Sequence, residues 1–136
     1  NWGFDSEPSR LDPAMTPNSA PRLALFAYGS LRERKVQRWL FGRAVPATPD
    51  SVQGACCRWV DDLDADLFRL TGQRGYPMLW LDANTPTCID GERLRLSAAG
   101  LQRADAYEGD AYRREVVQLR SGHRAWVYVE ARRARR

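Results

Sequence analysis

One carboxylate in the run ADAYEGDAYRRE (residues 104–115) occupies a position that favours acid–base chemistry. If SAAGLQRADAYE forms a helix, Glu108 shares one face with Leu101 and Ala104, which should point into the core. Glu108 also falls in the last helical turn, before Gly109, where the negative end of the helix dipole disfavours an anion. Desolvation acts in the same direction, so we expect the pKa of Glu108 to rise toward the value that a general base needs near neutral pH. The alternative is a surface carboxylate that turns to solvent or pairs with an arginine of the same run.

The sequence YGSL at Tyr28–Leu31 is a second candidate site. It follows the apolar run RLALFA and precedes a helical pattern, so a buried strand should stop here and a helix should open. Gly29 permits a close approach of the backbone to a ligand, and the first N–H groups of a helix lack intrahelical acceptors. Such a turn can hold a carboxylate or a developing oxyanion. The alternative is a plain strand-to-helix turn with Ser30 as the N-cap residue.

The residue types give little support to nucleophilic or metal-assisted chemistry. The three cysteines, Cys56, Cys57 and Cys88, are odd in number and include an adjacent pair, which favours free thiols and a cytoplasmic location over a disulfide framework. The chain has one histidine, His123, too few for a structural zinc site without a C-x-x-C motif. A cysteine or Ser30 paired with His123 is the nucleophilic alternative, although this histidine falls in a turn-like SGH sequence. We expect no metal and no organic cofactor.

Composition and charge indicate one ordinary soluble domain. The 136 residues are 43% hydrophobic and 28% charged, which suffices for a single core. The net charge of +4 belongs to the terminal ARRARR, because without its four arginines 17 basic residues balance 17 acidic ones. No apolar run approaches the length of a membrane span. We therefore expect neither nucleic acid nor a membrane as a partner, and the sequence carries no signal for an oligomeric state.

Three segments are expected along the chain. Residues 1–21 hold four of the eight prolines and should form an extended arm or linker. Residues 22–130 should form the folded domain, and residues 131–136 should form a basic tail.

Within the domain, short apolar runs predict strands and two amphipathic patterns predict helices. RERKVQRWLF places Val36, Trp39 and Leu40 on one face and ends at Gly42, and SAAGLQRADAYE is the second helix. After RLALFA, the pieces SVQGACCRWV, ADLFRL, YPMLWL and GERLRL are expected to be strands. YRREVVQL and RAWVYVE, joined by a serine–glycine turn, predict a terminal hairpin. This pattern indicates an α+β fold, a small mixed β-barrel of about six or seven strands with flanking helices.

Several motifs, in this order, resemble those of the gamma-glutamylcyclotransferase-like family. They are LFAYGSL, GYPML, DGERLRL, YEGDAYRRE and AWVYV, and the resemblance extends from about Leu23 to Val129. The family fold is a small mixed β-barrel with flanking helices, which agrees with the fold expected from the strand pattern. The resemblance implies a small-molecule γ-glutamyl substrate as the binding partner.

The resemblance also implies roles for individual residues. In such enzymes the loop of the first motif holds the glutamyl head of the substrate. The catalytic acid precedes a glycine in the later motif, and here that residue is Glu108. An aromatic residue in the last strand commonly lines the pocket. The residues that we accordingly expect around the substrate are Tyr28, Gly29, Ser30, Leu31, Tyr112 and Tyr128.

The activity that this implies is the cyclisation of a γ-glutamyl amide or amine. The substrate's α-amine would attack its own γ-carbonyl, closing 5-oxoproline and releasing an amine, with Glu108 as general acid and base. The leaving amine is open: a peptide, an amino acid, an isopeptide or a biosynthetic intermediate. The alternative from another class is a non-catalytic module of the same fold that binds a γ-glutamyl or amino-acid ligand without turnover.

Overall fold

The computed structural model describes residues 23–131. The expected arm at 1–21 and the expected tail, apart from Ala131, lie outside these residues. The described part of the chain is a mixed α+β fold with seven strands, three α-helices and one short 3₁₀ helix. In chain order the elements are β1 (Leu23–Ala27), the 3₁₀ helix η2 (Ser30–Arg32), α1 (Arg34–Phe41), β2 (Ala47–Gln53), β3 (Ala55–Asp61), α2 (Ala65–Thr71), β4 (Gly75–Leu81), β5 (Cys88–Leu96), α3 (Ala98–Glu108), β6 (Tyr112–Gln118) and β7 (Arg124–Glu130).

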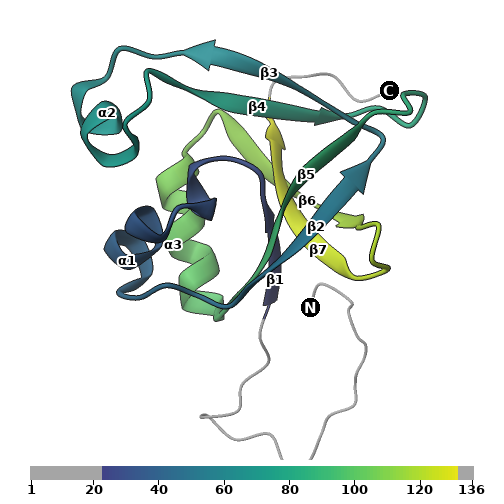
Figure 1. Cartoon of the computed structure of the whole chain (residues 1–136), viewed down its shortest axis with the longest axis horizontal. Helices are drawn as coiled ribbons and strands as arrows, with labels where there is room; N and C mark the ends of the chain where they lie inside the picture. The colour runs from purple at the N-terminus through teal and green to yellow at the C-terminus, as the bar shows by residue number, and fades with distance from the viewer. Residues whose placement is uncertain (1–22, 132–136) are drawn as a thin grey trace, which may run out of the picture.

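The strands form two sheets. A five-stranded sheet has the order β2-β5-β1-β7-β6, and β3 pairs with β4 in a separate two-stranded ribbon. Only the β1–β7 pair is parallel among the described strands, so the larger sheet is mixed. Figure 1 shows the ribbon crossing one end of the sheet, with α1 and α3 together on one side. The expected closed barrel is not confirmed, because the order of the described strands ends at β2 and β6 and these two edges do not pair.

The expected single strand SVQGACCRWV divides at Gly54 into the end of β2 and the start of β3. Gly54 has a φ of 76°, a left-handed conformation that glycine adopts without the steric cost of a side chain. Its N–H donates to the carbonyl of Thr87 (3.0 Å), just before β5 begins. β3 follows β2 directly, and the chain bends between them at Gly54. As a result β3 and its partner β4 leave the five-stranded sheet (Figure 1).

The apolar run LALFA forms β1, the central strand of the larger sheet. Because side chains alternate along a strand, Leu25 and Ala27 face one side and Phe26 faces the other. Leu25 and Ala27 pack with Val36 of α1 and Leu101 of α3. Phe26 packs in a second core cluster with residues of β2, β4 and β7. Burial on both faces holds β1 in place and fixes the start of the loop that follows it.

The expected hairpin is formed by β6 and β7, and the two expected helices are α1 and α3. α1 ends at Gly42, whose φ of 83° is left-handed. α3 begins at Ser97, whose side chain accepts a hydrogen bond from the N–H of Gly100 (3.0 Å), and ends before Gly109. No helix in residues 23–131 is long and apolar enough to cross a membrane.

The apolar face predicted for α1 is only partly buried. Val36 is fully buried, whereas Trp39 on the same face is 64% exposed. The other fully buried side chain of α1 is the polar Gln37. Its amide group is hydrogen-bonded to the backbone of Leu31, which precedes the helix, and of Val45, which follows it. Fewer apolar side chains of α1 therefore face the core than its apolar spacing indicates.

The run ADLFRL, expected to be a strand, is the helix α2. The Asp64 carboxylate accepts a hydrogen bond from the backbone N–H of Leu67 (2.9 Å) and caps the start of the helix. Gly72 ends the helix with a left-handed φ of 74°. Both capping residues lie outside the apolar run, and together they favour a helix over a strand. α2 joins β3 to β4 and packs against α1.

Candidate active site

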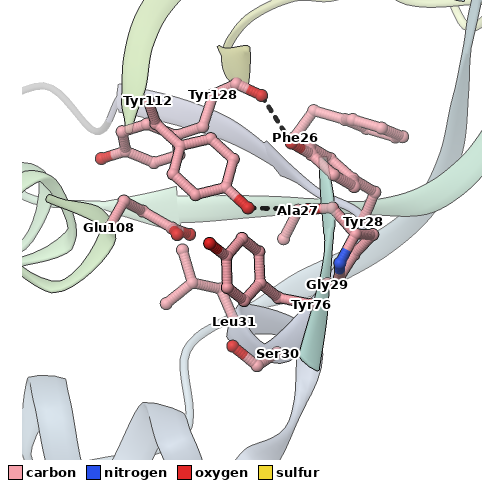
Figure 2. A pocket seen from close by; sticks show the side chains of 11 residues that line it. Phe26, Ala27, Tyr28, Gly29, Ser30, Leu31, Tyr76, Glu108, Tyr112 and Tyr128 are labelled. Carbon is pink, nitrogen blue, oxygen red and sulfur yellow. Dashed lines mark hydrogen bonds between the residues drawn. The ribbon is translucent and has the colours of Figure 1, made fainter. Parts of the chain in front are cut away.

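A small pocket lies where the ends of β1 and α3 meet strands β4, β6 and β7. Its accessible volume is about 30 Å³, which is room for about two water molecules. Its lining residues, most of them labelled in Figure 2, are Phe26, Ala27, Tyr28, Gly29, Ser30, Leu31, Tyr76, Pro77, Glu108, Tyr112 and Tyr128. The structure thus brings together every residue that the sequence assigns to the site, and the roles of these residues stay predictions.

Glu108 enters the pocket from the last turn of α3. Figure 2 shows its carboxylate directed toward the tyrosine rings of the pocket. Burial raises the pKa of Glu108 to about 8, the direction that the sequence predicts. In the described residues the two nearby arginines pair with other carboxylates: Arg113 with Glu115 (2.7 Å) and Arg114 with Asp105 (2.7 Å). Glu108 is therefore a desolvated carboxyl group that changes its protonation state near neutral pH.

The loop after β1 brings the start of η2 to the pocket wall. Ser30 and Leu31 are the first residues of η2, so their N–H groups have no acceptor within that helix. Gly29 lies against β4, since a Cβ at this position would stand 3.0 Å from Cγ of Pro77. The Ser30 hydroxyl shares a hydrogen bond with the Tyr107 hydroxyl (2.6 Å) and does not cap the helix, so the N-cap alternative for Ser30 is wrong.

Three tyrosines of the pocket have their hydroxyl groups bound to protein acceptors. Tyr28 donates to the backbone carbonyl of Tyr128 (2.6 Å), and the Tyr128 hydroxyl donates to Asp105 (2.7 Å). Tyr112 donates to the backbone carbonyl of Pro77 in β4 (2.7 Å). Burial raises the pKa of all three phenols above its usual range, so they stay neutral. These side chains offer ring surface to the pocket rather than groups that titrate near neutral pH.

Five residues at or beside the site were not assigned to it from the sequence: Phe26, Ala27, Tyr76, Pro77 and Tyr107. Tyr76 and Pro77 line the pocket from β4, and the motif GYPML contains both, so this motif could have indicated them. Tyr107 holds the Ser30 hydroxyl from the end of α3. Its position directly before Glu108 was the available signal.

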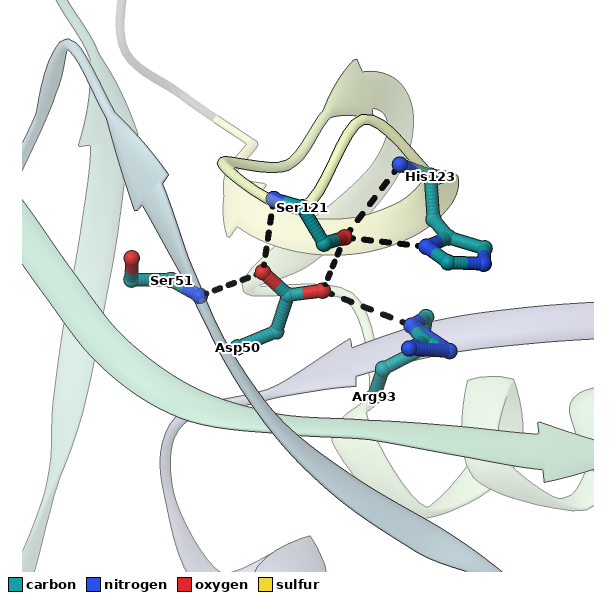
Figure 3. Close-up of polar contacts among 5 residues, drawn as sticks. All are labelled: Asp50, Ser51, Arg93, Ser121 and His123. Atoms are coloured by element: carbon teal, nitrogen blue, oxygen red, sulfur yellow. Dashed lines mark hydrogen bonds and ion pairs between the residues drawn. The ribbon is translucent and has the colours of Figure 1, made fainter.

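A serine, a histidine and an aspartate meet at the turn of the β6–β7 hairpin. Ser121 Oγ lies 3.0 Å from Nδ1 of His123 and donates to Oδ2 of Asp50 (2.6 Å), as Figure 3 shows. The hydrogen bonds do not connect these residues in the order of a catalytic triad, because the aspartate binds the serine and not the histidine. Burial alone would raise the pKa of Asp50, but hydrogen bonds from Ser121 and Ser51, with Arg93 nearby, lower it. This ionised carboxylate therefore anchors the hairpin turn to β2.

The other nucleophilic alternatives gain no support either. Cys56, Cys57 and Cys88 are free cysteines, as expected. Burial raises the pKa of the Cys57 thiol, which disfavours the reactive thiolate. Ser30 is engaged by the Tyr107 hydroxyl. Within residues 23–131 no three histidine, cysteine or carboxylate side chains are grouped as a metal-binding cluster.

Solved structures of other proteins share this fold. Two proteins of Arabidopsis thaliana with known solution structures are similar at a TM-score of 0.64 and 20% identity. One match covers 91% of this chain and 67% of that chain, and the other covers 86% and 74%. A solved structure of a gamma-glutamyl cyclotransferase is similar at a TM-score of 0.59 and 15% identity, with 80% of this chain and 66% of that chain covered. At these identities the likeness shows a common fold.

The family assignment rests on a sequence model. No curated protein matches this chain. The model of one family, described as gamma-glutamyl cyclotransferase, AIG2-like, matches residues 25–136. This match takes in the loop after β1, the glutamate at the end of α3 and the last strand. Since it covers most of the chain, the protein belongs to the gamma-glutamyl cyclotransferase, AIG2-like family.

Proposed function

We propose that this protein is a cyclotransferase that converts a γ-glutamyl amide or amine into 5-oxoproline and a free amine. The observation that carries the proposal is the carboxyl group of Glu108, which is directed into the pocket and has a pKa raised to about 8. A group with such a pKa can accept a proton and return it near neutral pH. Membership of the family supports this class of reaction.

The proposed reaction moves protons from one nitrogen of the substrate to another. Glu108 takes a proton from the α-ammonium group, and the freed amine forms a bond to the γ-carbonyl carbon while an electron pair moves to the carbonyl oxygen. When the carbonyl re-forms, the bond to the leaving nitrogen breaks. In total the α-nitrogen gives up two protons and the leaving nitrogen gains two, so the products are 5-oxoproline and an ammonium ion. Acid–base help of this kind is worth about 10²–10⁴-fold in rate.

The protein's second task is to hold the substrate in its folded-back conformation. Because the reaction is intramolecular, orientation can supply about 7–11 kcal/mol of the barrier. The N–H groups of Ser30 and Leu31, which have no acceptor within η2, are suited to hold the glutamyl carboxylate or the developing oxyanion.

The tyrosines of the pocket favour a cationic substrate group beside Glu108. The hydroxyl groups of Tyr28, Tyr112 and Tyr128 are bound to protein acceptors, and their phenols are neutral. Aromatic ring faces attract ammonium groups. Among the described residues that line the pocket, Glu108 is the one carboxyl group, so it is the available acceptor for the proton of an α-ammonium group.

The variant Glu108→Gln tests this proposal. Glutamine keeps the volume of the side chain but cannot accept the proton, so kcat for 5-oxoproline release should fall by about 10²-fold or more. Binding of 5-oxoproline should largely survive, since the loop after β1 is expected to do the holding. Stability should hold or rise, because an acid that is costly to ionise in this pocket is replaced by a neutral amide. A destabilised Glu108→Gln that keeps normal turnover would refute the catalytic role.

Glu115→Gln is the matched control. Glu115 pairs with Arg113 on β6, outside the pocket lining. This variant should therefore keep its turnover. A protein that binds 5-oxoproline but releases none from any γ-glutamyl amine would instead be a binding module.

A further inference from the structure

A groove among the three α-helices lies next to the candidate active site. Its accessible volume is about 580 Å³, far larger than that of the pocket at Glu108. Trp39 of α1, Leu67 and Leu70 of α2 and Tyr107 of α3 provide its apolar wall, and Lys35 and Arg69 are among its polar residues. No step of the proposed reaction uses this groove.

The groove and the pocket share one wall. Tyr107 lines the groove, and its hydroxyl is hydrogen-bonded to the hydroxyl of Ser30, which lines the pocket (2.6 Å). Tyr107 also directly precedes Glu108 in α3. The groove therefore lies on the other side of the Ser30–Tyr107 pair from the pocket.

The size of the pocket requires that a substrate extend beyond it. With an accessible volume of about 30 Å³, the pocket has room for about two water molecules. A glutamyl head already demands some movement of the side chains around Glu108. The amine half of the substrate must then lie outside the pocket.

The lining of the groove offers apolar contact more than charge. Trp39 is 64% exposed and meets the Tyr107 ring edge-on, with 6.1 Å between the ring centroids. The polar groups are engaged with one another: Lys35 donates to the backbone carbonyl of Arg69 (3.4 Å), and Arg69 pairs with Asp66. An exposed tryptophan beside two leucines is costly in water and gains from apolar contact.

We propose that this groove binds the leaving-amine half of the substrate and that it selects amines with an aromatic or large apolar body. This inference rests on the proposed cyclotransferase function and names its substrate class. The glutamyl head would occupy the pocket at Glu108, and the amine substituent would pass Ser30 and Tyr107 to lie against Trp39, Leu67 and Leu70.

Two substrates with the same scissile bond test the inference. γ-Glutamyl-phenethylamine carries an aromatic body that the proposal places in the groove, whereas γ-glutamyl-methylamine carries no such body. The wild-type protein should prefer the aromatic substrate in kcat/KM by about tenfold or more, the range that a few apolar contacts provide. Trp39→Ala should remove most of this preference, and Trp39→Phe should restore much of it. Trp59→Ala, which removes a 50% exposed tryptophan of β3 outside the groove, is the matched control and should leave the preference unchanged.

A titration with phenethylamine alone, followed by NMR, provides a readout that does not depend on turnover. Signals of Trp39 and Leu70 should shift in the wild-type protein, and the Leu70 shift should be lost in Trp39→Ala. Turnover of both substrates with no preference, or with a preference that Trp39→Ala leaves intact, would overturn the inference while the proposed function stands. Cyclisation of other γ-glutamyl amines but of neither test substrate would also overturn the inference. If no γ-glutamyl amine is cyclised, the proposed function fails, and the titration then decides whether the groove is an apolar-amine site: shifts at Trp39 support it, and their absence overturns it.

Discussion

At the residue scale, the ionisation of Glu108 links catalysis to stability. In the folded protein burial raises its pKa to about 8, whereas a glutamate in an unfolded chain titrates near about 4.3. Between these two values the folded state keeps a proton that the unfolded state has lost. Stability from this group therefore falls as the pH rises through that window and is constant above it.

We expect Glu108→Gln to gain stability relative to the wild-type protein as the pH rises from about 5 to about 8, and the difference to level off above that. Glutamine does not ionise, so it removes the pH dependence that this carboxyl group contributes. Melting temperatures of both proteins across this range measure the effect. The same ionisation should appear in kcat/KM as an increase through about pH 8, because the base must be deprotonated.

A difference in melting temperature that stays flat with pH would mean that Glu108 ionises at its ordinary pKa. Glu115→Gln again serves as the control. Glu115 lies in an ion pair with Arg113, so its replacement removes a favourable contact and should lower the melting temperature rather than raise it.

At the scale of elements, the position of η2 depends on a buried glutamine of α1. Gln37 is fully buried. Its Nε2 donates to the carbonyl of Leu31 (2.8 Å), and its Oε1 accepts from the N–H of Val45 (3.0 Å). One side chain thus ties the end of the candidate binding loop to the segment that follows α1. Without it, the N–H groups at the start of η2 would lose part of their support.

We expect Gln37→Leu to lower the free energy of unfolding by about 1–3 kcal/mol, because it leaves a buried carbonyl and a buried N–H without their partner. In the folded fraction kcat/KM should also fall, since the loop after β1 is less firmly held. Denaturant unfolding and 5-oxoproline release measure the two effects. The same change at the exposed Gln102 of α3 is the control and should be nearly neutral. Equal effects at the two positions would show that the buried hydrogen bonds of Gln37 contribute little.

Local patterns in the sequence predict most of these elements. Alternation and apolar runs located the strands, and the glycines after α1 and α3 marked the ends of those helices. The strand assignment for ADLFRL failed because the apolar run was weighed without its caps, Asp64 and Gly72. The spacing of Val36, Trp39 and Leu40 did not predict the exposure of Trp39, because helical periodicity does not distinguish a core face from a face that lines a groove.

The sequence predicted those residues of the candidate site whose positions depend on their neighbours in the chain. Helical spacing before Gly109 placed Glu108 toward the interior, and the strand-to-helix change located the loop at Tyr28. Tyr76 and Pro77 reach the pocket through the bent β3–β4 ribbon, whose placement depends on contacts between residues far apart in sequence. Closure of a barrel depends on the same kind of contact, so the strand count could not decide it.

At the scale of the whole molecule, the pocket exists only while the ribbon is docked on the larger sheet. The ribbon contributes Tyr76 and Pro77, and the rest of the lining comes from the sheet, its loop and α3. Polar contacts between described residues join the ribbon to the hairpin β6–β7. The Tyr112 hydroxyl donates to the Pro77 carbonyl (2.7 Å), and Arg58 pairs with Glu130 (2.9 Å). Tyr112, expected from the family resemblance to contact substrate, thus also links the ribbon to β6.

We expect Tyr112→Phe to loosen the ribbon selectively. The ring remains, so the packing of the pocket is kept, but the part-buried Pro77 carbonyl loses its donor, which should cost about 0.5–1.5 kcal/mol. Amide hydrogen exchange should accelerate in β3 and β4 more than in β6 and β7, and KM should rise more than kcat falls.

Arg58→Ala is the comparison variant. The Arg58 side chain is 48% exposed, and exposed ion pairs contribute about 0–1 kcal/mol, so its effect on exchange should be smaller. Exchange that accelerates equally in all four strands would show that ribbon and sheet open as one unit, and that the Tyr112 hydroxyl does not specifically hold the ribbon in place.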